Sequence, residues 1–303
     1  MKWQFLKSDP DNVIDYIADE LINSRLMIVL GSGISLALNI PSWDKLVEEM
    51  CNLAGVEYGA SNDKYVLMKY CKAKLGSNYI STVKDVLYAR YNPQLKEIAG
   101  NELLVALGAL IIGSKRGKAT NVITYNYDDV LETYLLYHGY MPNVISQVPY
   151  VKIDADVQVY HPHGYLPKYF GEDSKIVLDQ DSYSDSGNIL DPIYREIESA
   201  ALSSTLLMIG TSGEDNNINS LLVNVKKSHI SNSDVSRIVG FIFKLDSDLK
   251  DYEENAFKEK GIFCIRITDY SEIPNYISKI CRKALLKFYS DSDNFLFSEI
   301  DKS

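Results

Sequence analysis

The stretch "IVLGSGISLALNIPSW", residues 28–43, decides the fold. An apolar run that ends in Gly-x-Gly is typical of a buried strand that turns sharply beneath a phosphate. The third glycine of the dinucleotide-binding fingerprint is missing, because Leu36 stands at its position. The stretch therefore predicts a nucleotide site that departs from the usual Rossmann rule. The alternative is an ordinary strand-to-helix turn that uses glycine for its backbone freedom.

Apolar runs and helical patterns alternate along the rest of the chain. Strands are predicted at 26–30, 120–126, 157–164, 204–212, 237–245 and 262–268, and helices at about 11–24, from Ser42 onward, from 127 to Gly139, and around 219–229. Such alternation predicts an α/β fold, a Rossmann-like doubly wound parallel sheet. Residues 55–118 show helical patterns without strand signals, which predicts a small helical insertion within a single domain spanning residues 1–303.

Composition excludes several classes of protein. The 303 residues are 46% apolar and 24% charged, as in ordinary globular proteins, and the net charge of −10 argues against a broad nucleic-acid-binding surface. The longest apolar run, 102–113, is too short to cross a bilayer and predicts a buried core helix. Four scattered cysteines without a Cys-x-x-Cys pair and an amino terminus without a signal peptide predict a cytoplasmic location.

Four predicted strands end in unusual polar residues, in the segments "GSGIS", "TYNYD", "HPHG" and "GTSGED". In open parallel sheets, ligands bind beyond the carboxyl ends of the strands, where the strand order reverses. The coincidence of four polar strand ends therefore predicts one site along this edge of the sheet.

Two of these segments suit a phosphate or a ribose. In the first, backbone amides, hydroxyls and the dipole of a following helix would favour negative charge at Gly31, Ser32, Gly33 and Ser35. In the last, hydroxyl and polar groups are supplied by Gly210, Thr211, Ser212 and Asp215. Simple capping of the next helix by Asp215 or Asn216 is the alternative for the second group.

The other two segments hold candidates for chemistry. Asn126 is unusual at the end of an apolar strand, because a buried amide needs hydrogen-bond partners for its donor and its acceptor. Asn126 or Asp128 would alternatively cap the following helix. His163 is an acid–base candidate, since its reference pKa lies near neutrality. His161 and His163 could share a metal ion, but no third ligand is evident nearby, so no metal is predicted.

Taken in order, the motifs resemble the sirtuin superfamily, whose pattern runs Gly-Ala-Gly-Ile-Ser, Asn-x-Asp, His-Gly and Gly-Thr-Ser. They resemble more closely the bacterial sirtuin-like NADases of antiphage defence, such as the Thoeris effector and relatives that work beside HerA-type ATPases. The closer match includes the residues Pro41, Ser42, Trp43, Thr124, Asn126, Tyr127, Asp128 and Glu132. Ser32 replaces the usual alanine, and the zinc-binding cysteines and Asp-Phe-Arg segment of deacylases are missing.

The resemblance implies cleavage of NAD to nicotinamide and ADP-ribose, with NAD as the substrate, no metal, and Asn126 and His163 as catalytic residues. It implies that the diphosphate lies on the first turn, that Asp128 supports the geometry at the ribose, and that Thr211 and Ser212 lie nearer the adenosine half. It further implies a regulated NAD-depleting effector of antiphage defence, controlled by homo-oligomer formation or by a separate activator such as a HerA-type ATPase. An NAD-dependent protein deacylase and a non-catalytic sensor of NAD or ADP-ribose remain alternatives.

Overall fold

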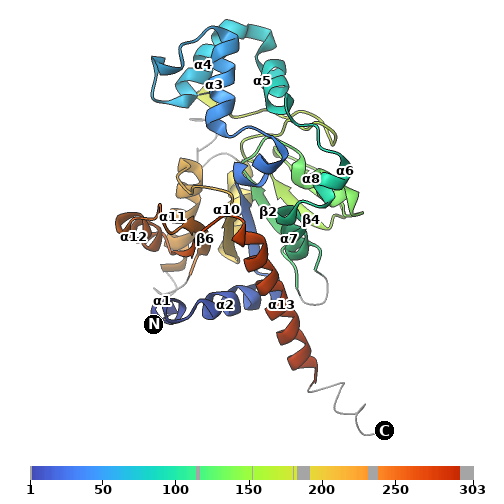
Figure 1. The fold of residues 1–303 in the computed structure, drawn as a ribbon, viewed down its shortest axis with the longest axis vertical. Coiled ribbons are helices and arrows are strands. Elements are labelled where there is room, and N and C mark those ends of the chain that lie inside the picture. Colours follow the sequence, from blue (N-terminus) through green and yellow to red (C-terminus); the bar gives the residue numbers. More distant parts are fainter. Residues whose placement is uncertain are drawn as a thin grey trace.

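The computed structural model describes residues 2–113, 117–151, 153–179, 181–182, 192–230 and 238–293. Its centre is a seven-stranded sheet in which every neighbouring pair of strands is parallel (Figure 1). The strand order is β3-β4-β2-β1-β5-β6-β7. The strands are β1 (Leu26–Leu30), β2 (Asn121–Thr124), β3 (Pro142–Ile145), β4 (Val157–Tyr160), β5 (Thr205–Ile209), β6 (Gly240–Leu245) and β7 (Ile262–Ile267). The chain leaves β1 toward β2 on one side and returns to β5 on the other, so the order reverses between β1 and β5.

Helices cover both faces of the sheet, which explains why β1 is apolar at every position. Alternate β1 side chains point to opposite faces: Ile28 lies in one core and Val29 in the other. The first core contains side chains of α2 (Pro10–Ile22), α7 (Glu102–Ile111), α8 (Val130–Tyr137) and α13 (Glu272–Asp293). The second contains side chains of α10 (Pro192–Leu202), α11 (Asn216–Ile230) and α12 (Asp251–Glu259). The predicted doubly wound α/β fold is confirmed.

A group of helices lies apart from the sheet, at the top of Figure 1. It consists of α3 (Trp43–Ala54), α4 (Lys64–Leu75) and α5 (Tyr79–Tyr88), which pack on one another. We call these three helices the helical group. Ser42 caps α3 as predicted, since its side chain accepts a hydrogen bond from the Lys45 amide.

Two further helices of the 55–118 segment lie nearer the sheet, namely α6 (Leu95–Ala99) and α7. The predicted core helix is confirmed in α7, which packs against α13 and buries Leu104 and Leu107. Across the described ranges, none of the helices combines the length and apolar character needed to cross a membrane. A short helix, α1 (Lys2–Ser8), precedes α2 and packs on it.

The structure contains two features that the sequence did not predict. Strand β3 was not predicted, because it has four residues, begins with Pro142 and carries the polar Asn143, whose amide donates to the Gln158 side chain on β4. Two 3-10 turns, Ser32–Ile34 and Leu36–Leu38, lie between β1 and α3, the helix predicted from Ser42. The second turn ends at Asn39 in the left-handed conformation, so no α-helix dipole points at the glycine turn.

The glycine turn after β1 leaves no room for a side chain. A Cβ atom on Gly31 would lie 2.5 Å from the Gly210 carbonyl oxygen and 2.8 Å from the Thr211 Cα. We therefore expect Gly31→Ala to lower the free energy of unfolding by about 2 kcal/mol or more, measured by denaturant titration. Gly59→Ala is the matched control, because the atom nearest its Cβ is a glutamate oxygen 4.0 Å away. Equal stability of the two variants would contradict the close contact.

Candidate active site

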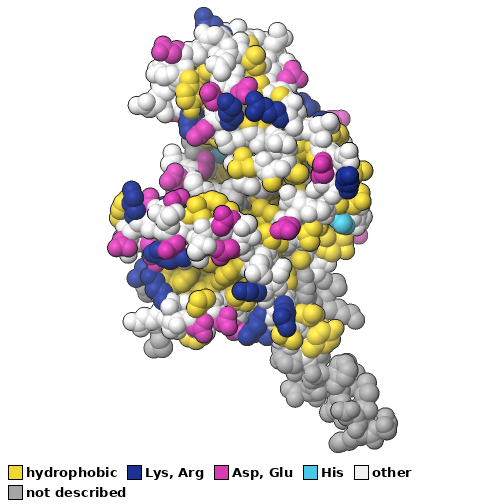
Figure 2. All heavy atoms as spheres, in the orientation of Figure 1, with side chains coloured by type: hydrophobic (Ala, Val, Ile, Leu, Met, Phe, Trp, Pro, Cys, Tyr) yellow, Lys and Arg dark blue, Asp and Glu magenta, His cyan; other side chains and the backbone are white. Residues whose placement is uncertain are grey.

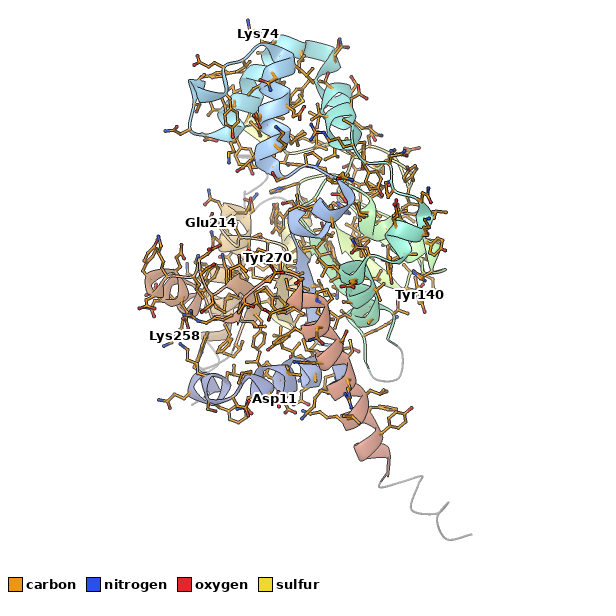
Figure 3. All side chains as sticks on the ribbon, viewed as in Figure 1. Asp11, Lys74, Tyr140, Glu214, Lys258 and Tyr270 are labelled. Carbon is orange, nitrogen blue, oxygen red and sulfur yellow. The ribbon has the colours of Figure 1, made fainter. Side chains whose placement is uncertain are left out.

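A cavity of about 280 Å³ opens at the carboxyl ends of β1, β2, β4 and β5, below the helical group. Figure 2 shows the molecule hollowed between the helical group and the part that contains the sheet. In Figure 3, Lys74 marks the outer end of that group, and Glu214 lies beside the turn after β5. Nine of the eleven predicted site residues line this cavity: Gly31, Ser32, Asn126, Asp128, His163, Gly210, Thr211, Ser212 and Asp215. The four polar strand ends therefore meet at one site, as the sequence predicted.

The backbone amides of the glycine turn form hydrogen bonds with other parts of the protein backbone. The Gly31 amide donates to the Ile209 carbonyl and the Gly33 amide donates to the Gly210 carbonyl, each over 3.0 Å. The prediction that these two amides face a diphosphate is therefore wrong for this structure. Their role is to join the turn after β1 to the turn after β5, while Ser32 lines the cavity.

Hydrogen bonds fix the orientation of the Asn126 amide. Its Nδ2 donates to the Gly31 carbonyl over 3.1 Å and to the Ser35 Oγ over 3.4 Å. Because a carbonyl oxygen can only accept, the atom facing Gly31 must be the amide nitrogen. The Asn126 Oδ1 is then the group that the side chain can offer to the cavity it lines.

The two predicted residues that lie behind the cavity wall are Gly33 and Ser35. Ser35 is fully buried, and its Oγ donates to the Asp128 Oδ1 over 3.0 Å. The sequence predicted a contact between Ser35 and a diphosphate. In the structure, Ser35 instead supports Asp128. The Val130 amide, the first of α8, donates to the same oxygen over 3.1 Å, so Asp128 satisfies one amide at the start of this helix, although Asp129 is its N-cap residue. Both bonds use Oδ1, which leaves the Asp128 Oδ2 for the cavity.

Burial governs the charge of Asp128. Loss of hydration raises its pKa to about 7, although the Val130 amide and the Ser35 hydroxyl favour the carboxylate. Negative charge on Glu132 and Asp129 raises the pKa further. The site therefore holds a carboxyl group that can gain or lose a proton near neutral pH.

His163 is buried and lines the cavity from the segment after β4. Its Nε2 accepts a hydrogen bond from the Asn217 Nδ2 over 3.1 Å, which places the proton of the neutral ring on Nδ1. Burial lowers the pKa of His163, and the nearby charge of Asp215 opposes that shift. The ring of Tyr125 stands edge-on to the imidazole at 4.9 Å. The side chain is thus a neutral imidazole whose Nε2 lone pair is already occupied.

His161 has a different place from the one considered in the sequence. It is completely buried; its Nδ1 donates to the Asn126 carbonyl over 3.1 Å, and its Nε2 lies 2.8 Å from the Glu132 Oε1. The Glu132 Oε2 is buried without a hydrogen-bond partner, which costs about 1–3 kcal/mol. No group of three or more metal-ligating side chains occurs within the described part of the chain.

The turn after β5 is held by its own side chains. The Thr211 Oγ1 accepts from the Gly213 amide, and the Ser212 Oγ accepts from the Glu214 amide. Asp215 caps α11, because its Oδ1 accepts from the Asn217 amide over 2.8 Å and from the next amide over 3.2 Å. The capping alternative is therefore realised for Asp215, although it also lines the cavity.

The helical group supplies an aromatic wall that sequence reasoning did not assign to the site. Trp43 on α3 and Tyr65 on α4 line the cavity with ring centroids 5.3 Å apart, and Leu87 of α5 adds to the same wall. Trp43 follows the glycine turn closely and could have been found from the sequence. Tyr65 and Leu87 carry no local signal, because only the packing of the helices brings them to the cavity.

The raised pKa of Asp128 predicts a pH-dependent effect of Asp128→Asn on stability. The unfolded carboxyl has a pKa of about 4, so the folded protein loses stability as the pH rises from about 4 to about 7. Asparagine stays neutral and keeps the acceptor for Ser35 and Val130. We expect the variant to gain up to about 4 kcal/mol over the natural protein above pH 7 and almost nothing near pH 4, measured by denaturant unfolding. A difference that does not change with pH would contradict this account.

Comparisons with known proteins agree with the motifs. Residues 120–265 match the family model of the SIR2-like domain. The chain is 23% identical over 214 residues to a Bacillus cereus (strain MSX-D12) protein named "NAD(+) hydrolase ThsA"; the match covers 69% of this chain and 42% of that relative. The chain thus spans less than half the length of this curated relative.

A solved structure titled as the crystal structure of a Sir2 homolog–NAD complex is also similar. It is 16% identical, the match covers 89% of this chain and 94% of that one, and the TM-score is 0.44. The resemblance seen in the motifs is confirmed by the family model and the curated relative. Within the chain, the match to the SIR2-like domain covers residues 120–265, the part that contains β2 to β6 and most of β7.

Proposed function

We propose that the chain hydrolyses NAD at the bond between nicotinamide and ribose. The observation that carries this proposal is the fixed side-chain amide of Asn126, whose Nδ2 is held inside the protein, in a cavity that it lines together with Asp128 and His163. The similarity to a relative named as an NAD(+) hydrolase supports the same activity.

The reaction breaks the bond between ribose C1′ and the nicotinamide nitrogen. The bonding electron pair leaves with nicotinamide, whose cationic ring becomes neutral, and C1′ develops oxocarbenium character, as in glycoside hydrolysis. Water then adds to C1′ and gives up a proton, so the products are nicotinamide, ADP-ribose and one proton. The protein must therefore hold the ribose, place a water molecule and accept a proton.

Three side chains suit these tasks. The Asn126 Oδ1 can accept a hydrogen bond from the attacking water or from a ribose hydroxyl. Asp128, with a pKa of about 7, can accept a proton near neutral pH. His163 takes the general-base role expected from the sequence if a substrate hydroxyl replaces the Asn217 amide at Nε2. While that bond persists, Asp128 is the better-placed proton acceptor.

The remaining cavity residues suit the rest of the dinucleotide. Ser32 on one turn and Thr211 and Ser212 on the other give hydroxyl groups for the diphosphate and the adenosine half. Trp43 offers an aromatic surface to a flat ring. No step in this reaction requires a metal ion.

The direct test is nicotinamide release from NAD by the purified protein, followed by chromatography. We expect Asn126→Ala and His163→Ala each to lower the rate by about 100-fold or more, because a positioned polar group in a water-poor site has effects of this size. Asn52→Ala and His138→Ala are matched controls with the same substitutions at exposed positions, and both should keep the natural rate.

The outcomes of this test separate the competing functions. Release without any acylated peptide supports the hydrolase, and release only when such a peptide is present supports a deacylase. Tight NAD binding without release supports a sensor. Full activity of Asn126→Ala would refute the assignment of the site.

We infer further that the activity depletes NAD during antiphage defence in the cytoplasm, and that formation of a homo-oligomer or a separate HerA-type ATPase controls it. The support is the ordered set of motifs, together with the need to restrain an enzyme that consumes a cofactor of its own cell. Four scattered cysteines without a Cys-x-x-Cys pair suit a reducing compartment. We propose one domain over residues 1–303 with residues 55–118 inserted. A rate per molecule that rises with protein concentration would support assembly as the switch.

A further inference from the structure

The backbone of Asn126 lies beyond the hydrogen bonds of the sheet. The last register pair between β2 and β4 is Ile123 with Tyr160, three residues before Asn126. Its amide donates to the Thr124 Oγ1 over 3.2 Å, and its carbonyl accepts from the His161 Nδ1 over 3.1 Å. Side chains therefore hold both backbone polar groups of Asn126.

The His161 ring is fixed at both nitrogens. Nδ1 must carry a proton, because the Asn126 carbonyl can only accept. One further proton lies between Nε2 and the Glu132 Oε1, which are 2.8 Å apart and shielded from water. The ring cannot rotate without breaking one of these two bonds. The ring of Tyr165 packs on the imidazole at a centroid distance of 4.5 Å.

This pair joins three elements behind the cavity. Glu132 lies on α8, His161 follows β4, and the carbonyl that they hold follows β2. The side chain of Asn126 is held separately, by its hydrogen bond to the Gly31 carbonyl on the turn after β1. A shift of the His161 ring would therefore move Asn126 against its bond to Gly31.

We propose that Glu132 and His161 are positioning residues that set the place of the Asn126 side-chain amide. Glu132 orients the imidazole, and the imidazole orients the backbone carbonyl of Asn126. His161 does not take part in proton transfer with the substrate, because it is completely buried behind Asn126. The effect on turnover rests on the proposed NAD hydrolysis, whereas the effect on the Asn126 amide does not.

Two substitutions at His161 separate the two bonds of the ring. Asparagine places its amide nitrogen near the position of Nδ1 and can keep the donor to Asn126, whereas glutamine places its polar atoms near Nε2 and keeps only the contact with Glu132. We expect the kcat for nicotinamide release to fall about tenfold more in His161→Gln than in His161→Asn, with KM changed by less than about threefold. Glu132→Gln, which can still hydrogen-bond Nε2, should lose less activity than Glu132→Ala.

A double-mutant cycle tests whether the effect passes through Asn126. In an Asn126→Ala background, we expect His161→Gln and His161→Asn to release nicotinamide at equal rates, because the side-chain amide that they position is gone. A tenfold difference that persists in that background would overturn the proposal. Equal losses in the two single variants, or losses confined to KM, would also overturn it.

A measurement without turnover keeps this test independent of the hydrolase. In ¹⁵N-labelled protein without NAD, the side-chain NH₂ resonance of Asn126 should shift in His161→Gln and stay near its natural position in His161→Asn. If the natural protein releases no nicotinamide, the proposed function fails, and the positioning proposal is still decided by these resonances. An Asn126 resonance that is the same in all three proteins would refute it.

Discussion

The turn after β1 lies against the turn after β5, backbone to backbone, and the site depends on this contact. Gly31 and Gly33 leave no space for a side chain between the two turns, and their amides donate to carbonyls at the end of β5. The contact lies where the strand order reverses, between β1 and β5. It also fixes the Gly31 carbonyl, which orients the Asn126 amide. The two glycines thus shape the site through the protein's own backbone.

Buried carboxylates behind the cavity tie the helical group to the sheet. Asp129 is completely buried and accepts bonds from the Tyr169 and Phe170 amides over 2.7 and 3.0 Å and from the Tyr88 hydroxyl of α5 over 3.2 Å. In the segment after β4, the buried Asp179 forms an ion pair with Lys72 of α4, with 2.8 Å between Oδ2 and Nζ. These bonds hold the segment after β4, which carries His163, against the helices that form the aromatic wall. The wall and the polar edge of the sheet are therefore parts of one connected structure.

Local pattern was sufficient to predict most of the fold and the meeting of the polar strand ends at one cavity. The apolar runs at β1 and β5 predicted buried strands because both faces of the sheet are covered, and the polar strand ends converged because parallel strands end on one edge. Strand β3 was missed, since four residues beginning with proline carry too little periodicity. The pairing of the Gly31 amide was missed because its partner lies on β5, far along the chain. For the same reason, the bond between Glu132 and His161, 29 residues apart, could not be predicted.

The chain has two tryptophans, and their positions allow a direct test of the central claim that this cavity binds NAD. Trp43 lines the cavity, whereas Trp3 does not line it and packs against Phe263 on the edge strand β7. Tryptophan fluorescence should be recorded during NAD titration, before appreciable turnover, in the natural protein, Trp3→Phe and Trp43→Phe. The account predicts quenching in the natural protein and in Trp3→Phe and none in Trp43→Phe. Quenching that survives in Trp43→Phe and disappears in Trp3→Phe would place NAD elsewhere and contradict it.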